Sequence, residues 1–246
     1  MLSGIRHIFR KADPFPYARL GVDMHSHVLP GLDDGTDTLE QALSMVADLM
    51  QKGYRKLILT PHIMGDFFKN TPAGIYEKLN LLKAAVQAKS WNIELECAAE
   101  YYLDEWFLQK IASDQPLLTF GDKYLLFETS YINEPLHFKE AVFKLKAAGY
   151  KPVLAHPERY TYLYGRFNEL ENMFAAGMLF QINLNSLAGY YSEAAKQVAE
   201  KLVDQEMVHF VGTDAHHARH LHFLTKTSGM PYFKKVLALP LLNYEL

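Results

Sequence analysis

The stretch Leu20-Gly-Val-Asp-Met-His-Ser-His-Val-Leu29 decides how the rest of the chain is interpreted. A short apolar approach leads into Asp23-Met24-His25-Ser26-His27, and alternate side chains of a strand point to the same face. We therefore expect Asp23, His25 and His27 to share one side of a strand end, where two imidazoles and a carboxylate favour a divalent transition metal. A His-x-His pair taken alone is more typical of an edge strand with surface histidines.

Five further apolar runs end in a residue of a kind that ligates metals. They span residues 57–62, 93–100, 124–128, 152–156 and 208–216. Charged residues avoid burial unless they are paired or bind a metal, so core packing alone does not explain this recurrence. Asp34 joins the set because it follows His27 closely, although residues 31–35 also read as a plain turn. The candidate ligands are His25, His27, Asp34, His62, Glu100, Glu128, His156, Asp214 and His216.

This number of nitrogen and oxygen ligands exceeds what one ion takes. A structural zinc site uses four closed ligands, typically rich in Cys. Bridging carboxylates instead allow two or three divalent ions, about 3.5–4 Å apart. Clustered cations balance phosphate charge in a transition state and generate hydroxide near neutral pH, so we predict a hydrolytic site for a phosphoryl substrate.

Two arginines follow candidate ligands by three residues, Arg159 after His156 and Arg219 after His216. Guanidinium groups bind phosphate bidentately, so both are candidate catalytic residues. For Arg159 the alternative is a salt bridge to Glu158 or to another carboxylate at the rim. For Arg219 the alternative is an ordinary exposed loop over residues 218–222.

Helix and strand patterns alternate along the chain and predict an α/β fold. Thr38-Leu-Glu-Gln41 is a capping box that starts a helix ending at Gly53. Further helices are expected at 75–86, 104–112, 138–148, 170–176, 194–205 and 233–239, and strands at 56–60, 93–98, 124–127, 152–155, 179–184 and 208–212. Alternation of this kind predicts a parallel sheet covered by helices. Since ligands follow the ends of so many strands, a closed barrel with one mouth is favoured over an open sheet.

Composition narrows the class of protein. The chain of 246 residues is 49% hydrophobic and has no Gly/Pro/Ser linker, so we expect a single domain over 1–246. Its net charge of -3 gives no case for binding nucleic acid. The single cysteine, Cys97, suits a reducing compartment, and we expect a cytoplasmic location.

The N-terminal extension, residues 1–19, carries an amphipathic pattern at residues 1–11. A short helix docked on its own domain is the preferred interpretation, and a helix in peripheral contact with a membrane is the alternative. No apolar run approaches the roughly 20 residues of a transmembrane helix.

The motifs together resemble the PHP (polymerase and histidinol phosphatase) superfamily. Within it, the chain resembles the bacterial manganese-dependent protein-tyrosine phosphatases of capsule and exopolysaccharide gene clusters. The resemblance is carried by Asp-Met-His-Ser-His27 followed by Asp-Asp-Gly35, Thr-Pro-His62, Ala-Glu-Tyr-Tyr102, Phe-Glu-Thr129, Ala-His-Pro-Glu-Arg-Tyr160 and Thr-Asp-Ala-His216. It implies a distorted TIM-like (β/α)7 barrel of the PHP type that holds three metals, with manganese expected and Fe, Zn or Mg as alternatives.

The resemblance also implies how the ligands divide among the metals. His25, His27, Glu100 and Asp214 would hold the first metal, and Glu100 would bridge to a second held with Glu128 and His156. Asp34, His62 and His216 would hold the third. Arg159 matches the phosphate-binding arginine of the family, whereas Arg219 lies nearer to the Asp-x-His motif than the second arginine of the family does.

The leading hypothesis is therefore a metal-dependent phosphatase acting on phosphotyrosine in a protein, such as the tyrosine-rich tail of a polysaccharide-chain-length kinase. A small-molecule phosphoesterase acting on a sugar, nucleotide or histidinol phosphate is the first alternative. A metal-binding regulatory module without turnover is the second. Aromatic residues expected near the mouth could stack on a phenyl ring or simply pack in the core and rim. They are Phe67, Phe68, Tyr101, Tyr102, Tyr131 and Tyr160.

Overall fold

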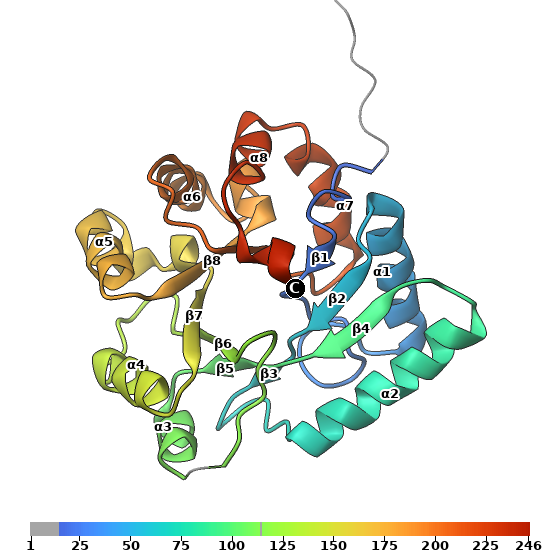
Figure 1. Cartoon of the computed structure of the whole chain (residues 1–246), viewed down its shortest axis with the longest axis horizontal. Helices are drawn as coiled ribbons and strands as arrows, with labels where there is room; N and C mark the ends of the chain where they lie inside the picture. Colours follow the sequence, from blue (N-terminus) through green and yellow to red (C-terminus); the bar gives the residue numbers. More distant parts are fainter. Residues whose placement is uncertain (1–14, 114) are drawn as a thin grey trace, which may run out of the picture.

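The computed structural model of the chain describes residues 15–113 and 115–246 (Figure 1). The helix expected over residues 1–11 lies outside the described residues. None of the helices in the described part of the chain has the length and apolar character needed to cross a bilayer.

All strand pairs within the two sheets are parallel, as predicted. One sheet contains β1 (Val22–Asp23), β2 (Lys56–Leu59) and β4 (Glu94–Cys97) in that order. The other contains β3 (His62–Ile63), β5 (Glu100–Tyr102), β6 (Tyr124–Glu128), β7 (Lys151–Ala155), β8 (Leu179–Asn183) and β9 (Phe210–Gly212), also in that order.

The two sheets are joined because the same chain segments run from one into the other. β2 continues into β3 across Thr60 and Pro61, and β4 continues into β5 across Ala98 and Ala99. Backbone bonds from Ala98 N to Leu59 O and from Glu100 N to Pro61 O carry the pairing through the break. Pro61 has no N–H to donate, which accounts for an interruption at this point.

Helices surround the strands on the outside of the ring (Figure 1). They are α1 (Leu39–Lys52), α2 (Pro72–Ala88), α3 (Glu105–Ala112), α4 (Phe138–Ala147), α5 (Phe167–Ala175), α6 (Glu193–Asp204), α7 (Ala218–Thr227) and α8 (Pro231–Val236), with 3₁₀ turns η1 (Pro157–Arg159), η2 (Thr161–Leu163), η3 (Leu184–Ala188) and η4 (Leu242–Glu245). The capping box of Thr38 and Gln41 and the left-handed Gly53 that ends α1 are confirmed.

The expectation of a loop over residues 218–222 was wrong, because these residues begin α7. His220, Leu221, Leu224 and Thr227 form its buried face at helical spacing. The several histidines and the arginine at its start hid this amphipathic pattern.

The ring closes between β1 and β9. We call this junction the seam, and in it side-chain hydrogen bonds replace most of the backbone hydrogen bonds that two paired strands would form. Only an isolated parallel bridge, Ser26 with Ala215, joins the backbone segments that follow these two strands. The Asp23 carboxylate accepts from Thr213 N at 2.9 Å and from Thr213 Oγ1 at 2.6 Å. Asp23 was expected to face the metal site beside His25 and His27; the structure instead turns it to Thr213 across the seam.

Asn243 of η4 completes the seam from the other end. Its Oδ1 accepts from Val211 N at 2.9 Å, and its Nδ2 donates to Val211 O at 2.9 Å and to Val22 O at 3.4 Å. The side chain is 1% exposed. A C-terminal residue thus supplies the hydrogen bonds that a continuous ladder between β1 and β9 would have made.

The interior of the ring is layered along the strands. A buried apolar cluster that includes Val22, Ile58, Leu126 and Phe210 fills it, with Leu242 and Leu246 packed against the cluster. Alternate side chains continue the inward face toward the carboxyl ends of the strands, so that Tyr124 and Leu126 are followed by Glu128. The polar residues therefore lie above an apolar floor at one mouth.

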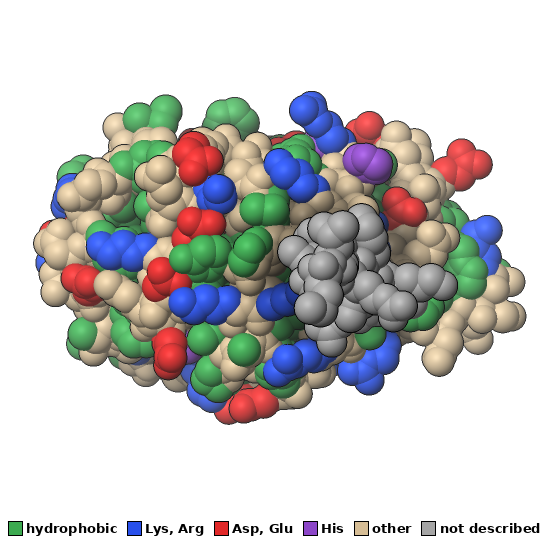
Figure 2. All heavy atoms as spheres, turned by 90° about the horizontal axis from the view of Figure 1, so that it is seen from above, with side chains coloured by type: hydrophobic (Ala, Val, Ile, Leu, Met, Phe, Trp, Pro, Cys, Tyr) green, Lys and Arg blue, Asp and Glu red, His purple; other side chains and the backbone are tan. Residues whose placement is uncertain are grey.

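The outer surface is of mixed character. Figure 2 shows the side that carries α8, where basic, acidic and hydrophobic side chains are interspersed. No large patch of one charge sign covers this face, in agreement with the small net charge of -3.

We predict that Asn243→Ala lowers the free energy of unfolding by at least about 3 kcal/mol. The substitution leaves the Val211 N–H and two carbonyls buried without a partner, and each such group costs about 1–3 kcal/mol. Urea titration measures the effect. Glu245→Ala, which changes an exposed side chain of the same turn, is the control and should shift stability by less than about 0.5 kcal/mol. A loss below about 1 kcal/mol in Asn243→Ala would mean that the seam does not depend on this side chain.

Candidate metal centre

Glu100 lies at the centre of the polar mouth, at the start of β5, and is fully buried. Its Oε2 is 3.2 Å from His25 Nε2, 3.4 Å from His27 Nε2 and 3.2 Å from His62 Nδ1. Its Oε1 is 3.0 Å from His156 Nε2. Four imidazoles from three separate segments of the chain therefore surround one carboxylate.

The structure brings every predicted ligand into this mouth. The ligand atoms form four overlapping groups, and within each group they lie within 4.8 Å of one another. The groups are His27, Asp34, His62 and His216; His25, His27 and Glu100; His25, His156 and Asp214; and His62, Glu100 and Glu128. The geometry supports more than one ion, since no single group contains all of these residues.

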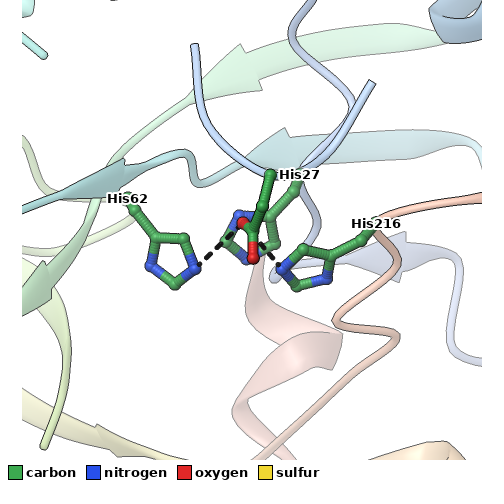
Figure 3. A group of neighbouring side chains, drawn as sticks. His27, His62 and His216 are labelled. Atoms are coloured by element: carbon green, nitrogen blue, oxygen red, sulfur yellow. Dashed lines mark ion pairs between the residues drawn. The ribbon is translucent and has the colours of Figure 1, made fainter. Parts of the chain in front are cut away.

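The groups overlap only partly with the division implied by the resemblance. Asp34, His62 and His216 do lie together, with His27 as a neighbour. Figure 3 shows the rings of His27, His62 and His216 turned toward a common region, where His62 Nε2 and His216 Nε2 lie 3.6 and 3.4 Å from Asp34 Oδ1. The resemblance implies that Glu100 and Glu128 share an ion with His156. In the structure these two carboxylates group with His62, and His156 Nε2 is 3.8 Å from Glu128 Oε2. Which residue holds which ion stays a prediction.

A chain of amide side chains fixes which nitrogen of His25 carries the proton. The Asp214 carboxylate accepts only, so the NH₂ group of Asn183 is the atom 2.7 Å from Asp214 Oδ2. Asn183 Oδ1 then accepts from Gln181 Nε2 at 2.9 Å. Gln181 Oε1 consequently accepts from His25 Nδ1 at 2.8 Å, and the backbone N–H of His156 donates to the same oxygen at 3.3 Å. The Nε2 of His25 is therefore free to ligate.

Asp33 fixes His27 in the same way. Its Oδ2 lies 2.8 Å from His27 Nδ1 and accepts from the His62 backbone N–H at 2.9 Å, while its Oδ1 accepts from Gly35 N at 3.0 Å. Burial by itself raises the pKa of the Asp33 carboxyl, but His27 and His62 outweigh burial and hold the pKa below its usual range. Sequence reasoning missed Asp33, Gln181 and Asn183. The adjacent acids Asp33 and Asp34 were the one available signal for Asp33.

With both Nδ1 atoms committed to acceptors, the Nε2 atoms of His25 and His27 face each other at 3.3 Å. The carboxylate oxygens Glu100 Oε2 and Asp214 Oδ1 lie within 3.5 Å of both. Lone pairs and negative charges in this arrangement repel one another unless a cation lies between them. The donor set therefore fits divalent metal ions.

In the absence of a metal, protons would have to supply this positive charge. Burial lowers the pKa of His25, but the carboxylates of Glu100 and Asp214 outweigh burial and raise it. Burial and the neighbouring His27 lower the pKa of His62, yet Glu100 and Glu128 raise it to about 9. Buried atoms still lack hydrogen-bond partners in the described part of the chain, among them His62 Nδ1, Glu100 Oε2 and His156 Nδ1. Orphaned ligand atoms of this kind are a second observation in favour of a metal centre.

Two of the candidate ligands have a strained backbone. His156, directly after β7, has φ 34°, and Asp214, two residues after β9, has φ 48°. Residues other than Gly rarely adopt this left-handed backbone conformation, and strained backbone of this kind is concentrated at functional sites. The turn redirects each side chain toward the mouth immediately after its strand ends.

Arg159 lies over the mouth and contacts the candidate ligand Asp214. Its Nη1 is 2.7 Å from Asp214 Oδ2, and its guanidinium lies between the rings of Tyr131 and Tyr191, 4.5 and 4.1 Å from their centroids. The alternative salt bridge to Glu158 is not formed. Glu158 Oε1 instead accepts from Asn183 N and Ser186 Oγ. The alternative of a salt bridge to another carboxylate is realised with Asp214.

Arg219 has an exposed side chain near the start of α7 and is not among the residues that line the cavity above the metal centre. Its predicted role with phosphate stays a prediction.

The cavity has a volume of about 630 Å³. Asp34, His62, Glu128, Arg159, Asp214 and His216 line its floor and inner wall, and Phe67, Phe68, Tyr102 and Tyr131 also line it. Tyr101 and Tyr160, expected near the mouth, are 1% and 0% exposed and belong to the core. Four of the six predicted aromatic residues therefore line the cavity, and Tyr191, which was not predicted, lines it as well.

Comparison with known proteins gives a consistent result. A sequence model of the family described as "Capsular polysaccharide synthesis, CpsB/CapC" matches residues 21–228. The chain is 29% identical over 205 residues to the tyrosine-protein phosphatase YwqE of Bacillus subtilis (strain 168). The matched region covers 83% of this chain and 81% of that protein. It is 26% identical over 205 residues to the putative tyrosine-protein phosphatase CapC of Staphylococcus aureus, with 83% and 80% covered.

Solved structures agree with the fold. The crystal structures of YwqE from Bacillus subtilis and CpsB from Streptococcus pneumoniae, described as unique metal-dependent tyrosine phosphatases, match with a TM-score of 0.80 at 29% identity over 92% of this chain and 90% of that chain. Histidinol phosphate phosphatase from Lactococcus lactis matches with a TM-score of 0.53 at 14% identity over 85% and 94%, a likeness of fold alone. The α/β fold of the PHP type is confirmed.

We predict that Asp33→Asn weakens metal binding about 10–100-fold, the usual effect of removing a residue that orients a metal-binding histidine. All three hydrogen bonds to Asp33 need an acceptor, and an amide offers a donor at one of the two positions. Competition with a chelator of known affinity measures the change. Asp37→Asn alters an exposed carboxylate nearby and serves as the control. Equal metal affinity in Asp33→Asn and wild type would remove Asp33 from the metal centre.

Proposed function

The chain belongs to the CpsB/CapC family of capsular polysaccharide synthesis proteins, and on this premise we propose that it is a metal-dependent phosphatase that hydrolyses phosphotyrosine in a protein. The proposal rests on one observation: candidate ligand side chains cluster around Glu100 at the floor of a cavity that Arg159 also lines. A phosphate in that cavity would meet the metal centre on one side and a guanidinium on the other.

We propose that all the candidate ligands hold metal ions and that Arg159 binds the substrate phosphate. The ions, when bound, supply Lewis-acid stabilisation of the phosphoryl oxygens and lower the pKa of water. Asp214 Oδ2 uses only one nitrogen of Arg159, which leaves further N–H groups of the guanidinium to donate to phosphate. Tyr131 and Tyr191 lie against the guanidinium and limit the rotamers of Arg159.

The leaving group argues for an aryl phosphate. The phenol of tyrosine has a pKa of about 10, well below the value of about 15.7 for water, so a tyrosyl oxygen departs without a dedicated proton donor more readily than an alkyl oxygen does. Tyr102, Tyr131 and Phe68 in the cavity wall also suit a phenyl ring, since aromatic rings pack favourably on one another.

The physiological partner follows from the family rather than from the site. We infer a protein substrate in capsule or exopolysaccharide synthesis, namely the phosphorylated tail of a tyrosine kinase of that process. Two or three ions are expected, and the resemblance makes manganese the first choice. Iron, zinc and magnesium are alternatives, because nitrogen and oxygen ligands also accept these metals and metal supply decides among them. The cytoplasmic location expected from the single cysteine stays a prediction.

The proposed function predicts turnover of phosphotyrosine by the metal-loaded chain and its loss after chelation. The assay compares a phosphotyrosine peptide and phenyl phosphate with a sugar phosphate, a nucleotide and histidinol phosphate. We expect kcat/KM for the two aryl phosphates to exceed that for the alkyl phosphates by at least about tenfold, because of the better leaving group. Preference for an alkyl phosphate would favour the small-molecule phosphoesterase, and no turnover with any substrate at full metal loading would favour the regulatory module.

A second prediction concerns Arg159. Arg159→Ala and Arg159→Lys should each lower kcat/KM by about 30–1000-fold. This corresponds to a loss of roughly 2–4 kcal/mol of transition-state stabilisation, as expected when a donor to the transition state is removed. Lysine should not rescue, because a point charge lacks the bidentate fork. Metal content should be retained, since Asn183 still donates to Asp214.

Arg166→Ala is the matched control, because Arg166 forms an exposed ion pair with Glu134, and exposed pairs contribute about 0–1 kcal/mol to stability. Near-wild-type kcat/KM in Arg159→Ala, measured beside metal content, would reject the phosphate-binding role.

A further inference from the structure

Two large apolar side chains stand in solvent at the mouth of the cavity. Phe67 is 80% exposed and Ile132 is 72% exposed, and both line the cavity. They come from separate loops, one between β3 and α2 and the other between β6 and α4. Single exposed apolar residues are common, but two that flank the entrance of a substrate cavity suggest a contact with the ligand.

The loop that carries Phe67 is held in place by hydrogen bonds, so the exposure of this ring is built into the fold. Gly65 N donates to Asp104 Oδ2 at 2.8 Å, and Met64 N donates to Phe68 O at 2.9 Å. Asn70 Nδ2 donates to both Leu32 O and His62 O at 2.8 Å. The neighbouring ring of Phe68 stacks on His62, with centroids 5.6 Å apart, which ties the loop to the metal centre.

The loop that carries Ile132 is anchored as well. Ser130 Oγ accepts from the backbone N–H groups of Ile132 at 3.3 Å and Asn133 at 3.2 Å. Thr161 donates from both N and Oγ1 to Tyr131 O, each at 2.8 Å. Both apolar side chains are therefore presented by ordered turns, and their contact with a ligand would need little further ordering.

Charge divides the cavity into an inner and an outer part. Arg159 is the one Lys or Arg among the described residues that line it, and it lies over the metal ligands. Asp66 and Asp104, which belong to none of the candidate ligand groups, contribute carboxylates to the same lining. The inner part also holds the carboxylates of Asp34, Glu128 and Asp214, so a phosphate is drawn there by Arg159 together with the ions of the proposed metal centre. An acidic group beside the phosphate would be repelled by Asp66 and Asp104.

We propose that Phe67 and Ile132 form a subsite for an apolar or aromatic side chain next to the phosphotyrosine of an extended peptide. This inference rests on the proposed function and defines its substrate class. The substrate is a peptide segment whose flank is apolar and free of acidic residues. The cavity of about 630 Å³ is in the size range that holds ligands much larger than a phosphate group.

The test measures kcat/KM of the metal-loaded chain on four substrates. Three are phosphotyrosine peptides that differ only in having Leu, Gly or Glu on both sides of the phosphotyrosine, and the fourth is phenyl phosphate. We expect wild type to prefer the Leu peptide over the Gly peptide by about tenfold, the effect of partial burial of one such side chain. The Glu peptide should be the poorest of the three.

Phe67→Ser and Ile132→Ser should each reduce turnover of the Leu peptide by about 3–10-fold, toward that of the Gly peptide. Both should leave phenyl phosphate turnover and metal content within about twofold of wild type, since neither residue is a proposed ligand. Phe143→Ser and Leu136→Ser are matched controls, because Phe143 and Leu136 are 73% and 96% exposed and do not line the cavity.

The outcomes separate the subsite from the proposed function. Equal kcat/KM for the three peptides, with good turnover of phenyl phosphate, would overturn the subsite and leave the phosphatase standing. Equal losses of Leu-peptide turnover in Phe143→Ser and Leu136→Ser would also overturn it. Non-specific binding of the peptide to exposed apolar side chains would then explain the preference for the Leu peptide. Absence of turnover on every phosphotyrosine substrate would overturn the proposed function itself.

Discussion

Repulsion at the buried Glu100 carboxylate is the constraint on which the rest of the structure depends. Imidazole nitrogens of His25, His27, His62 and His156 point at its two oxygens, and the carboxylates of Glu128 and Asp214 lie close by. Such a group of lone pairs and negative charges is stable in a protein interior only with cations between them. The fold therefore has to hold these side chains in place against their own repulsion.

The barrel meets this demand by separating layers. An apolar floor fills the ring below the ligands, and the ligands follow on the same inward faces or on strained turns directly beyond the strand ends. Buried acceptors behind the imidazoles, Gln181 for His25 and Asp33 for His27, fix the tautomers and leave the inner nitrogens as lone-pair donors. Close packing beneath the site and hydrogen bonds behind it give the positional accuracy that metal ligation requires.

Asp214 links the metal centre to the proposed phosphate site. Its Oδ1 faces the histidines, while its Oδ2 receives hydrogen bonds from Arg159, Asn183 and Tyr191. One carboxylate thus orients the candidate phosphate-binding arginine and takes part in the ligand set. The position of the guanidinium is consequently set relative to the candidate ligands, so that a phosphate held by Arg159 would lie beside the ions that these residues would hold.

The sequence by itself determined the alternation of helices and strands, the parallel sheet and the set of candidate ligand side chains. Apolar periodicity, the Thr38 capping box and the Gly53 stop are local features, and ligands at strand ends can be listed without coordinates. Only the tertiary structure decided that Asp23 bonds Thr213 across the seam, that Asn243 completes that seam and that Asp33, Gln181 and Asn183 orient the candidate ligands. It also decided that Arg159 pairs with Asp214 and that residues 218–222 begin a helix. The physical reason is range: periodicity and capping act within a few residues of the chain, whereas a hydrogen-bond partner or a shared metal depends on which distant strand ends the closed ring brings within about 3 Å of each other.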